Sequence, residues 1–127
     1  MRLLLDTHIF LWFISKDNRI SKSVRDNICE ADEVYLSVVS VWEVIIKQSL
    51  GKLPLPHSAH TYLPTQRQRH GIDSLSISEN TLAFLSALPD YHRDPFDRLL
   101  ICQALEHDLT LMTVDEEIVK YPVTILR

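Results

Sequence analysis

Glycine is scarce in this sequence, with two residues among 127, and no Ser/Gly-rich tract, repeat or low-complexity segment interrupts the chain. Flexible linkers between domains are commonly rich in glycine and serine, so nothing marks a domain boundary. A chain of this length can bury roughly two-thirds of its unfolded surface around one core. We therefore expect a single domain over residues 1–127.

A membrane-spanning segment is also absent. The apolar stretch at residues 3–14 is interrupted by Asp6 and His8, and neither half has the roughly 20 residues that a bilayer requires. No small-residue cleavage site follows it, as a secretory signal would need. A buried strand followed by a buried helix explains the stretch better, and we expect a cytoplasmic protein without a membrane partner.

Cysteine and histidine show no disulfide or zinc-binding pattern. Cys29 and Cys102 are isolated within helical patterns, without a CxxC motif, which predicts two buried free thiols. Among the six histidines, His57 and His60 alone approach a paired spacing. Their polar, proline-flanked surroundings favour a surface pair over a zinc site.

Apolar runs alternate with helical patterns along the chain. The run at residues 2–5 is continuously apolar, which is typical of a strand buried in a parallel sheet. Ser40 is the expected N-cap of a helix that Gly51 terminates. The alternation predicts an α/β fold, a mainly parallel central sheet with helices on both faces. Strands are predicted at residues 2–5, 33–37, 71–75, 109–113 and 123–126, and helices at 7–15, 21–31, 40–50, 57–70, 78–88, 95–107 and 115–120.

Several of these apolar runs end in an acidic residue at a helix start. Asp6 follows the first strand, Glu43 lies early in the helix after the second, and Asp115 follows the strand before the last. Asp94 and Asp97 begin the helix over residues 95–107. The carboxyl ends of parallel strands share one edge of the sheet, so these carboxylates are expected to converge. Several carboxylates cannot stay ionised together without a cation, and the convergence predicts a divalent metal site.

Each acid also has a purely structural interpretation. Asp6 and Asp94 could each cap a helix, and Ser40 with Glu43 has the spacing of a capping box. Asp115 also suits the positive end of a helix dipole. These preferences explain the acids one at a time. They do not predict that most of the strands should be followed by an acidic residue. This repeated placement of acids favours a shared site.

The net charge of −4, from 17 acidic and 13 basic residues, does not by itself exclude nucleic acid. Five of the acids belong to the proposed pocket, and the remaining twelve nearly balance the thirteen Lys and Arg residues. The surface outside the pocket would therefore be close to neutral. With a bound dication offsetting part of the pocket's charge, such a surface can accept a phosphodiester.

Four motifs in this chain resemble those of PIN domains, the fold of metal-dependent ribonucleases that includes the VapC toxins of toxin–antitoxin pairs. In that family an apolar strand runs into Asp and then Thr or Ser, and three further acids follow in fixed contexts. The resemblance covers nearly the whole chain and all four acids, in order. The matching segments are LLLDT at 3–7, SVWE at 40–43, DRLLICQA at 97–104 and TVD at 113–115.

The resemblance implies a three-layer PIN-like fold and metal-dependent cleavage of RNA. Its catalytic residues and metal ligands would be Asp6, Glu43, Asp97 and Asp115, whose hard oxygen atoms suit Mg²⁺ or Mn²⁺. The cation would activate a water and stabilise the leaving 3′ oxygen, so that products carry a 5′ phosphate and a 3′ hydroxyl. Asp94 is expected mainly as a helix cap, with a metal contact as the alternative.

Residues beside these acids are candidates for substrate contact. Thr7 could orient Asp6 or a metal-bound water, or it could be a plain first-turn residue of the helix. His8 stands where many relatives carry a small polar residue. His92 and Arg93 could contact RNA phosphates, although solvated loop residues are the ordinary interpretation. Arg98 stands at a position where a small residue is common in the family, and it could influence which RNA base the site prefers.

The resemblance further implies three partners: RNA as substrate, a second copy of the chain in a homodimer, and a cognate antitoxin protein. The antitoxin would lay an apolar segment along the pocket and place an Arg or Lys among its carboxylates. The homodimer has separate support, because several apolar residues of the first and third helices exceed what a monomer of this size readily hides. They are Ile9, Leu11, Trp12, Val44 and Ile45.

Three other protein classes fit the sequence less well. A receiver-like domain shares the length and an acidic Mg²⁺ pocket, but it needs an acid pair after the first strand and a strand-end Lys. Here Asp6 stands alone, and residues 123–126 contain no Lys. A HAD-type phosphatase needs Asp-x-Asp, which Asp6-Thr7-His8 lacks. A non-catalytic PIN-like binding module would be expected to have lost one of the four acids, and all four are present.

Overall fold

The computed structural model describes residues 1–127 and shows strands interleaved with helices along the whole chain. The predicted alternation is confirmed, except that the helix expected over residues 115–120 is only a three-residue 3₁₀ turn, η1 (Ile118–Lys120). The strands are β1 (Arg2–Leu5), β2 (Glu33–Ser37), β3 (Asp73–Leu75), β4 (Thr110–Met112) and β5 (Ile125–Leu126). The α-helices are α1 (Thr7–Ile14), α2 (Lys22–Glu30), α3 (Val38–Ser49), α4 (Ala59–Arg69), α5 (Glu79–Ala87) and α6 (Pro95–His107).

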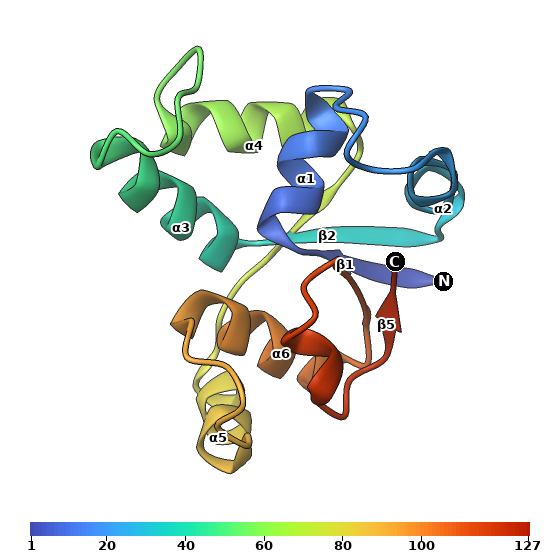
Figure 1. The fold of residues 1–127 in the computed structure, drawn as a ribbon, viewed down its shortest axis with the longest axis vertical. Helices are drawn as coiled ribbons and strands as arrows, with labels where there is room; N and C mark the ends of the chain where they lie inside the picture. The colour runs from blue at the N-terminus through green and yellow to red at the C-terminus, as the bar shows by residue number, and fades with distance from the viewer.

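The five strands form one parallel sheet in the order β3-β2-β1-β4-β5, with β1 at its centre. Helices α1, α2 and α4 lie on one side of the sheet and α6 on the other (Figure 1). Leu3 and Leu5 pack into the core with α1, α2 and α4, whereas Leu4 packs into the core with α6. All three leucines are completely buried. Burial on both faces explains why this strand is continuously apolar. The predicted α/β fold with helices on both faces is confirmed.

The N-cap of helix α3 lies three residues earlier than predicted, at Ser37 rather than Ser40. Strand β2 passes into α3 without a loop, so its last residue also serves as the helix cap. The Ser37 hydroxyl accepts a hydrogen bond from the Val39 amide at 3.0 Å. Ser40 lies completely buried in the first turn of α3. The capping box expected from Ser40 and Glu43 is therefore wrong, and the Glu43 carboxylate is available for other contacts.

One of the two cysteines also differs from expectation. Cys102 is buried in α6, as predicted, but Cys29 near the end of α2 is exposed. The buried stripe of α2 consists of Val24 and Ile28, and Cys29 falls about 100° further round the helix, beyond that stripe. Both thiols are free. None of the helices combines the length and the apolar character needed to cross a membrane.

The parallel sheet determines where the functional residues gather. Strands β1, β2 and β4 all end at the same edge of the sheet, and α1 and α3 begin there directly after β1 and β2. Helix α6 contacts both β4 and α3, so its amino-terminal turn lies close to this edge. The segments that carry the predicted acids therefore meet at one place, although Asp6 and Asp115 are 109 positions apart in the sequence.

Candidate metal centre at the carboxyl edge of the sheet

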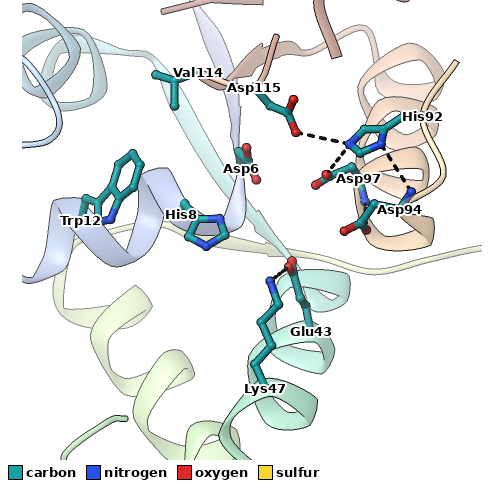
Figure 2. Close-up of a pocket in the computed structure, with 10 residues that line it drawn as sticks. All are labelled: Asp6, His8, Trp12, Glu43, Lys47, His92, Asp94, Asp97, Val114 and Asp115. Atoms are coloured by element: carbon teal, nitrogen blue, oxygen red, sulfur yellow. Dashed lines mark hydrogen bonds and ion pairs between the residues drawn. The ribbon is translucent and has the colours of Figure 1, made fainter. Parts of the chain in front are cut away.

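A pocket of about 280 Å³ opens at this edge, and all five predicted acids line it (Figure 2). Among the residues proposed for substrate contact, His8 and His92 also line it, whereas the buried Thr7 and the exposed Arg93 do not. Lys47 is a lining residue that sequence reasoning missed. The complete lining consists of Asp6, His8, Trp12, Glu43, Lys47, His92, Asp94, Asp97, Val114 and Asp115.

Asp6 occupies the N-cap position of α1, but its side chain makes no capping hydrogen bond. Instead, its Oδ2 accepts a hydrogen bond of 2.7 Å from the hydroxyl of Thr113, which follows β4. Both side chains are buried, with Asp6 only 6% exposed. Burial raises the pKa of Asp6, and the Thr113 hydrogen bond opposes that shift in part. The structural interpretation of Asp6 as a helix cap is wrong.

Glu43 is held by two groups that flank its buried carboxylate. Its Oε1 accepts a hydrogen bond of 2.8 Å from the Thr7 hydroxyl, which also lies 2.7 Å from that of Ser40. Its Oε2 accepts one of 2.6 Å from Lys47 Nζ, one helical turn further along α3. Thr7 therefore orients Glu43, rather than Asp6 as proposed. Because Lys47 follows Glu43 by four residues, the (i, i+4) spacing was the available sequence signal for this pair.

Asp94 is the N-cap of α6, which confirms its favoured role. Its Oδ1 accepts hydrogen bonds from the amides of Phe96 at 2.9 Å and Asp97 at 3.1 Å. Pro95 at the first helical position adds no unpaired amide. Since Asp94 provides the capping contacts, the Asp97 carboxylate is not needed for the helix start and faces the pocket.

Asp97 shows how crowded the negative charge is. Burial, followed by the charges of Asp6, Asp94 and Glu43, raises the pKa of Asp97 to about 7, and the nearby His92 ring opposes this shift. The carboxyl group is thus only partly ionised near neutral pH when no cation is bound. This electrostatic strain is what a divalent cation would relieve, and the oxygen donors present suit Mg²⁺ or Mn²⁺.

His92 lies inside the site rather than in solvent. Its Nε2 lies 2.9 Å from Asp97 Oδ2 and 3.3 Å from Asp115 Oδ2 (Figure 2). The donor atoms of these three residues lie within 4.8 Å of one another, a spacing that one metal ion could span. The carboxylates of Asp97 and Asp115 raise the pKa of His92 against the opposing effect of burial. The ordinary interpretation as a solvated loop residue is therefore wrong for His92.

Arg98 does not reach the pocket, contrary to the expectation that it bears on base preference. Its guanidinium donates hydrogen bonds to the carbonyl oxygen of Pro89 at 3.0 Å and to Asp90 Oδ1 at 3.2 Å. Its side chain therefore points at the loop between α5 and α6. Thr113 was likewise missed as the partner of Asp6, although it stands within the TVD motif at residues 113–115.

Comparison with curated sequences relates this chain to two mycobacterial proteins. It is 27% identical over 117 residues to a protein named Ribonuclease VapC22 from Mycobacterium tuberculosis (strain ATCC 25618 / H37Rv), covering 91% of this chain and 88% of that one. It is 34% identical over 64 residues to Ribonuclease VapC16 from the same strain, covering 50% of this chain and 41% of that one.

Two solved structures illustrate the similarity in fold. One, titled VapBC2 from Rickettsia felis bound to a DNA fragment from their promoter, superposes with a TM-score of 0.74 at 15% identity, covering 99% of this chain and 98% of that chain. FitAcB from Neisseria gonorrhoeae superposes with a TM-score of 0.68 at 19% identity, covering 98% and 96%. The family model of the PIN domain matches residues 3–123. This chain therefore belongs to the PIN domain family.

Proposed function

We propose that this chain is a metal-dependent endoribonuclease that hydrolyses RNA phosphodiesters. The observation that carries the proposal is the convergence of four carboxylates from separate elements of the chain in one pocket. The names of the two curated relatives support RNA as the substrate. The family match also removes the main reason to consider a receiver-like domain. The four carboxylates belong to Asp6, Glu43, Asp97 and Asp115.

Each carboxylate would have a prepared orientation in this reaction. When bound, the Mg²⁺ or Mn²⁺ ion supplies positive charge that favours ionisation of a water and stabilises the leaving oxygen. Thr113 holds Asp6 toward the pocket, and Thr7 with Lys47 holds Glu43 there. Lys47, one-third exposed at the pocket, also provides a cation close to where a phosphate would lie. The chain thus holds these metal-binding carboxylates in position before the substrate binds.

The first prediction is that RNA cleavage depends on both the metal and Asp6. Purified protein incubated with mixed RNAs in Mg²⁺ or Mn²⁺ should cleave them, and EDTA should abolish cleavage. Asp6→Asn should slow cleavage by a factor on the order of 100 or more, because it weakens stabilisation of the developing charge. Gel analysis of RNA fragments measures both effects.

Asp26→Asn, which alters an exposed acid on α2 that pairs with Lys22, is the matched control and should cleave like the wild type. Cleavage that persists in EDTA or in Asp6→Asn would show that another site, or a contaminant, is responsible.

The second prediction concerns the stability of the metal-free protein. The pKa of Asp97 is raised from 3.8 to about 7 in the folded protein. Protonated Asp97 therefore contributes to the free energy of unfolding fully below pH 3.8, and this contribution is lost as the pH rises through about 7. At pH 8, Asp97→Asn should therefore be as stable as the metal-free wild type, or more so. Adding Mn²⁺ should raise the melting temperature of the wild type more than that of the variant.

Asp94→Ala provides the contrast, since it removes the helix cap and should lower the free energy of unfolding by about 0.5–2 kcal/mol. Thermal unfolding followed by circular dichroism between pH 4 and pH 8 measures these differences. A large loss of stability in Asp97→Asn at pH 8 would instead assign a capping role to Asp97.

The chain would also act as the toxin of a toxin–antitoxin pair, inhibited by its partner protein. A second hollow of about 390 Å³ adjoins the acidic pocket and shares His8 and Trp12 with it. Its walls include apolar residues of α1 and of the segment between α3 and α4, notably Leu11, Leu53 and Leu55. A partner could lay an apolar segment there and extend an Arg or Lys into the carboxylates.

The third prediction follows from this arrangement. Expression of the wild-type chain in a bacterial host should arrest growth, and co-expression of the adjacent upstream gene should relieve the arrest. Asp6→Asn and Asp97→Asn should be harmless. Leu53→Glu, in the second hollow, should weaken binding of the partner in a pull-down while the purified variant still cleaves RNA.

Leu50→Glu is the control for the added charge, because Leu50 is 61% exposed and lies outside both hollows. A wild-type chain that is harmless alone and binds no product of the neighbouring gene would contradict the toxin role and leave the nuclease proposal standing.

A homodimer through α3 completes the proposed function. Most of the apolar residues that were expected to need a dimer partner are already covered by the chain itself. Ile9, Leu11 and Val44 are buried in its own core. Three exposed apolar residues lie instead on one stripe of α3 at (i, i+4, i+7) spacing. They are Val38, Trp42 and Ile45, at 37%, 49% and 39% exposure.

The fourth prediction is that the chain is a dimer at micromolar concentration and that Ile45→Glu converts it to a monomer. A buried glutamate without a partner is costly, so the substitution should disfavour association. Light scattering after size exclusion measures the mass. Leu82→Glu on α5, where Leu82 is 50% exposed, is the control and should remain dimeric. A monomer mass for the wild type would rule out this dimer.

A further inference from the structure

The His92 ring stands between two of the carboxylates that would bind the metal. Figure 2 shows the ring pointing into the pocket, with Asp97 and Asp115 on the side of Nε2. These two acids come from different parts of the fold, one from the first turn of α6 and the other from the segment after β4. The imidazole is thus a direct link between two elements that have no backbone connection at the site.

The backbone at the N-cap of α6 contacts the other nitrogen of the ring. The amide of Asp94 donates a hydrogen bond of 3.4 Å to His92 Nδ1. With Nδ1 as the acceptor, Nε2 carries the hydrogen of the ring and donates it toward the carboxylates. His92 is thereby set up as a hydrogen-bond donor to Asp97 and Asp115, and not as a lone-pair ligand of the metal.

The position of the ring is determined by two residues outside the pocket. The His92 amide donates a hydrogen bond of 2.7 Å to the hydroxyl of Tyr121, a residue that is 3% exposed. Arg98 donates to the carbonyl oxygens of His92 at 3.4 Å and Pro89 at 3.0 Å. Neither Tyr121 nor Arg98 lines the acidic pocket, so their contacts act on the loop that carries His92.

We propose that His92 is a positioning residue of the metal centre, which aligns Asp97 and Asp115 as a pair of ligands before the cation binds. The inference rests on the proposed metal-dependent function. Two carboxylates on separate elements repel each other, and a shared N–H donor offsets that repulsion. Without it, the Asp115 side chain, which is 32% exposed, can turn toward solvent and must be ordered again when the cation binds.

Hydrogen bonds of this kind to metal ligands typically change metal affinity by about 10–100-fold. The test is Mn²⁺ binding to the full chain, measured from the electron paramagnetic resonance signal of free Mn²⁺. His92→Ala should bind Mn²⁺ about 10–100-fold more weakly than the wild type. His92→Gln, whose amide can donate from a similar place, should recover part of the loss. Tyr121→Phe should weaken binding by several-fold, because the hydroxyl that holds the loop is gone.

His57→Gln, an exposed histidine outside the acidic pocket, is the matched control and should bind Mn²⁺ like the wild type. Melting temperatures of the metal-free variants establish that each is folded. If His92→Ala does not fold, the Mn²⁺ affinities of His92→Gln and Tyr121→Phe are compared with that of the wild type instead.

Two results would overturn the inference while leaving the nuclease proposal intact. One is Mn²⁺ affinity within twofold of the wild type in folded His92→Ala or, where that variant does not fold, in Tyr121→Phe. The other is a pulsed paramagnetic resonance signal from an imidazole nitrogen bound directly to Mn²⁺ in the wild type, because His92 would then be a ligand. A wild-type chain that binds no divalent cation rejects the proposed function itself, and this inference with it.

Discussion

The mutual repulsion of carboxylates at one edge of the sheet is the constraint on which the rest of the site depends. Asp6 and Glu43 are almost completely buried, and each would be costly there without a hydrogen-bond donor. Thr113 supplies that donor to Asp6, and Thr7 with Lys47 supplies it to Glu43. Nearly every polar contact around the pocket has the same effect, since it holds an acid in place and offsets part of its charge.

The apolar framework makes this crowding possible. The three leucines of strand β1 are completely buried at the centre of the sheet, and burial of each side chain stabilises the fold by about 1.5–3 kcal/mol. Because β1 lies between β2 and β4, the residues that follow these three strands are forced to be neighbours. The two cores on opposite faces supply the stabilisation that opposes the electrostatic cost at this edge.

The acidic pocket and the apolar hollow beside it form one continuous surface, joined at His8 and Trp12. The two halves have different chemistry: carboxylates for a cation on one side, and leucine and proline side chains on the other. A substrate phosphate and an inhibitory protein segment could both approach this surface, which would make cleavage and inhibition mutually exclusive. The proposed nuclease activity and its proposed control by a partner would therefore share this one surface.

The sequence alone determined the order of the elements, the fold class and the five acids, because these depend on local patterns. Continuous apolar runs indicate buried parallel strands, and an acid directly after such a run must lie at the carboxyl edge. The role of Asp94 as a helix cap was also predictable, since Pro95 follows it.

Only the tertiary structure decided which groups hold those acids. Ser37 caps α3 in place of Ser40 because β2 runs directly into the helix, and this start determines where Glu43 points. Thr113 reaches Asp6 across 107 residues of chain. His92 reaches Asp115 from a loop whose path depends on Tyr121. Such contacts join residues distant in sequence, and their geometry follows from packing, which local propensity does not encode.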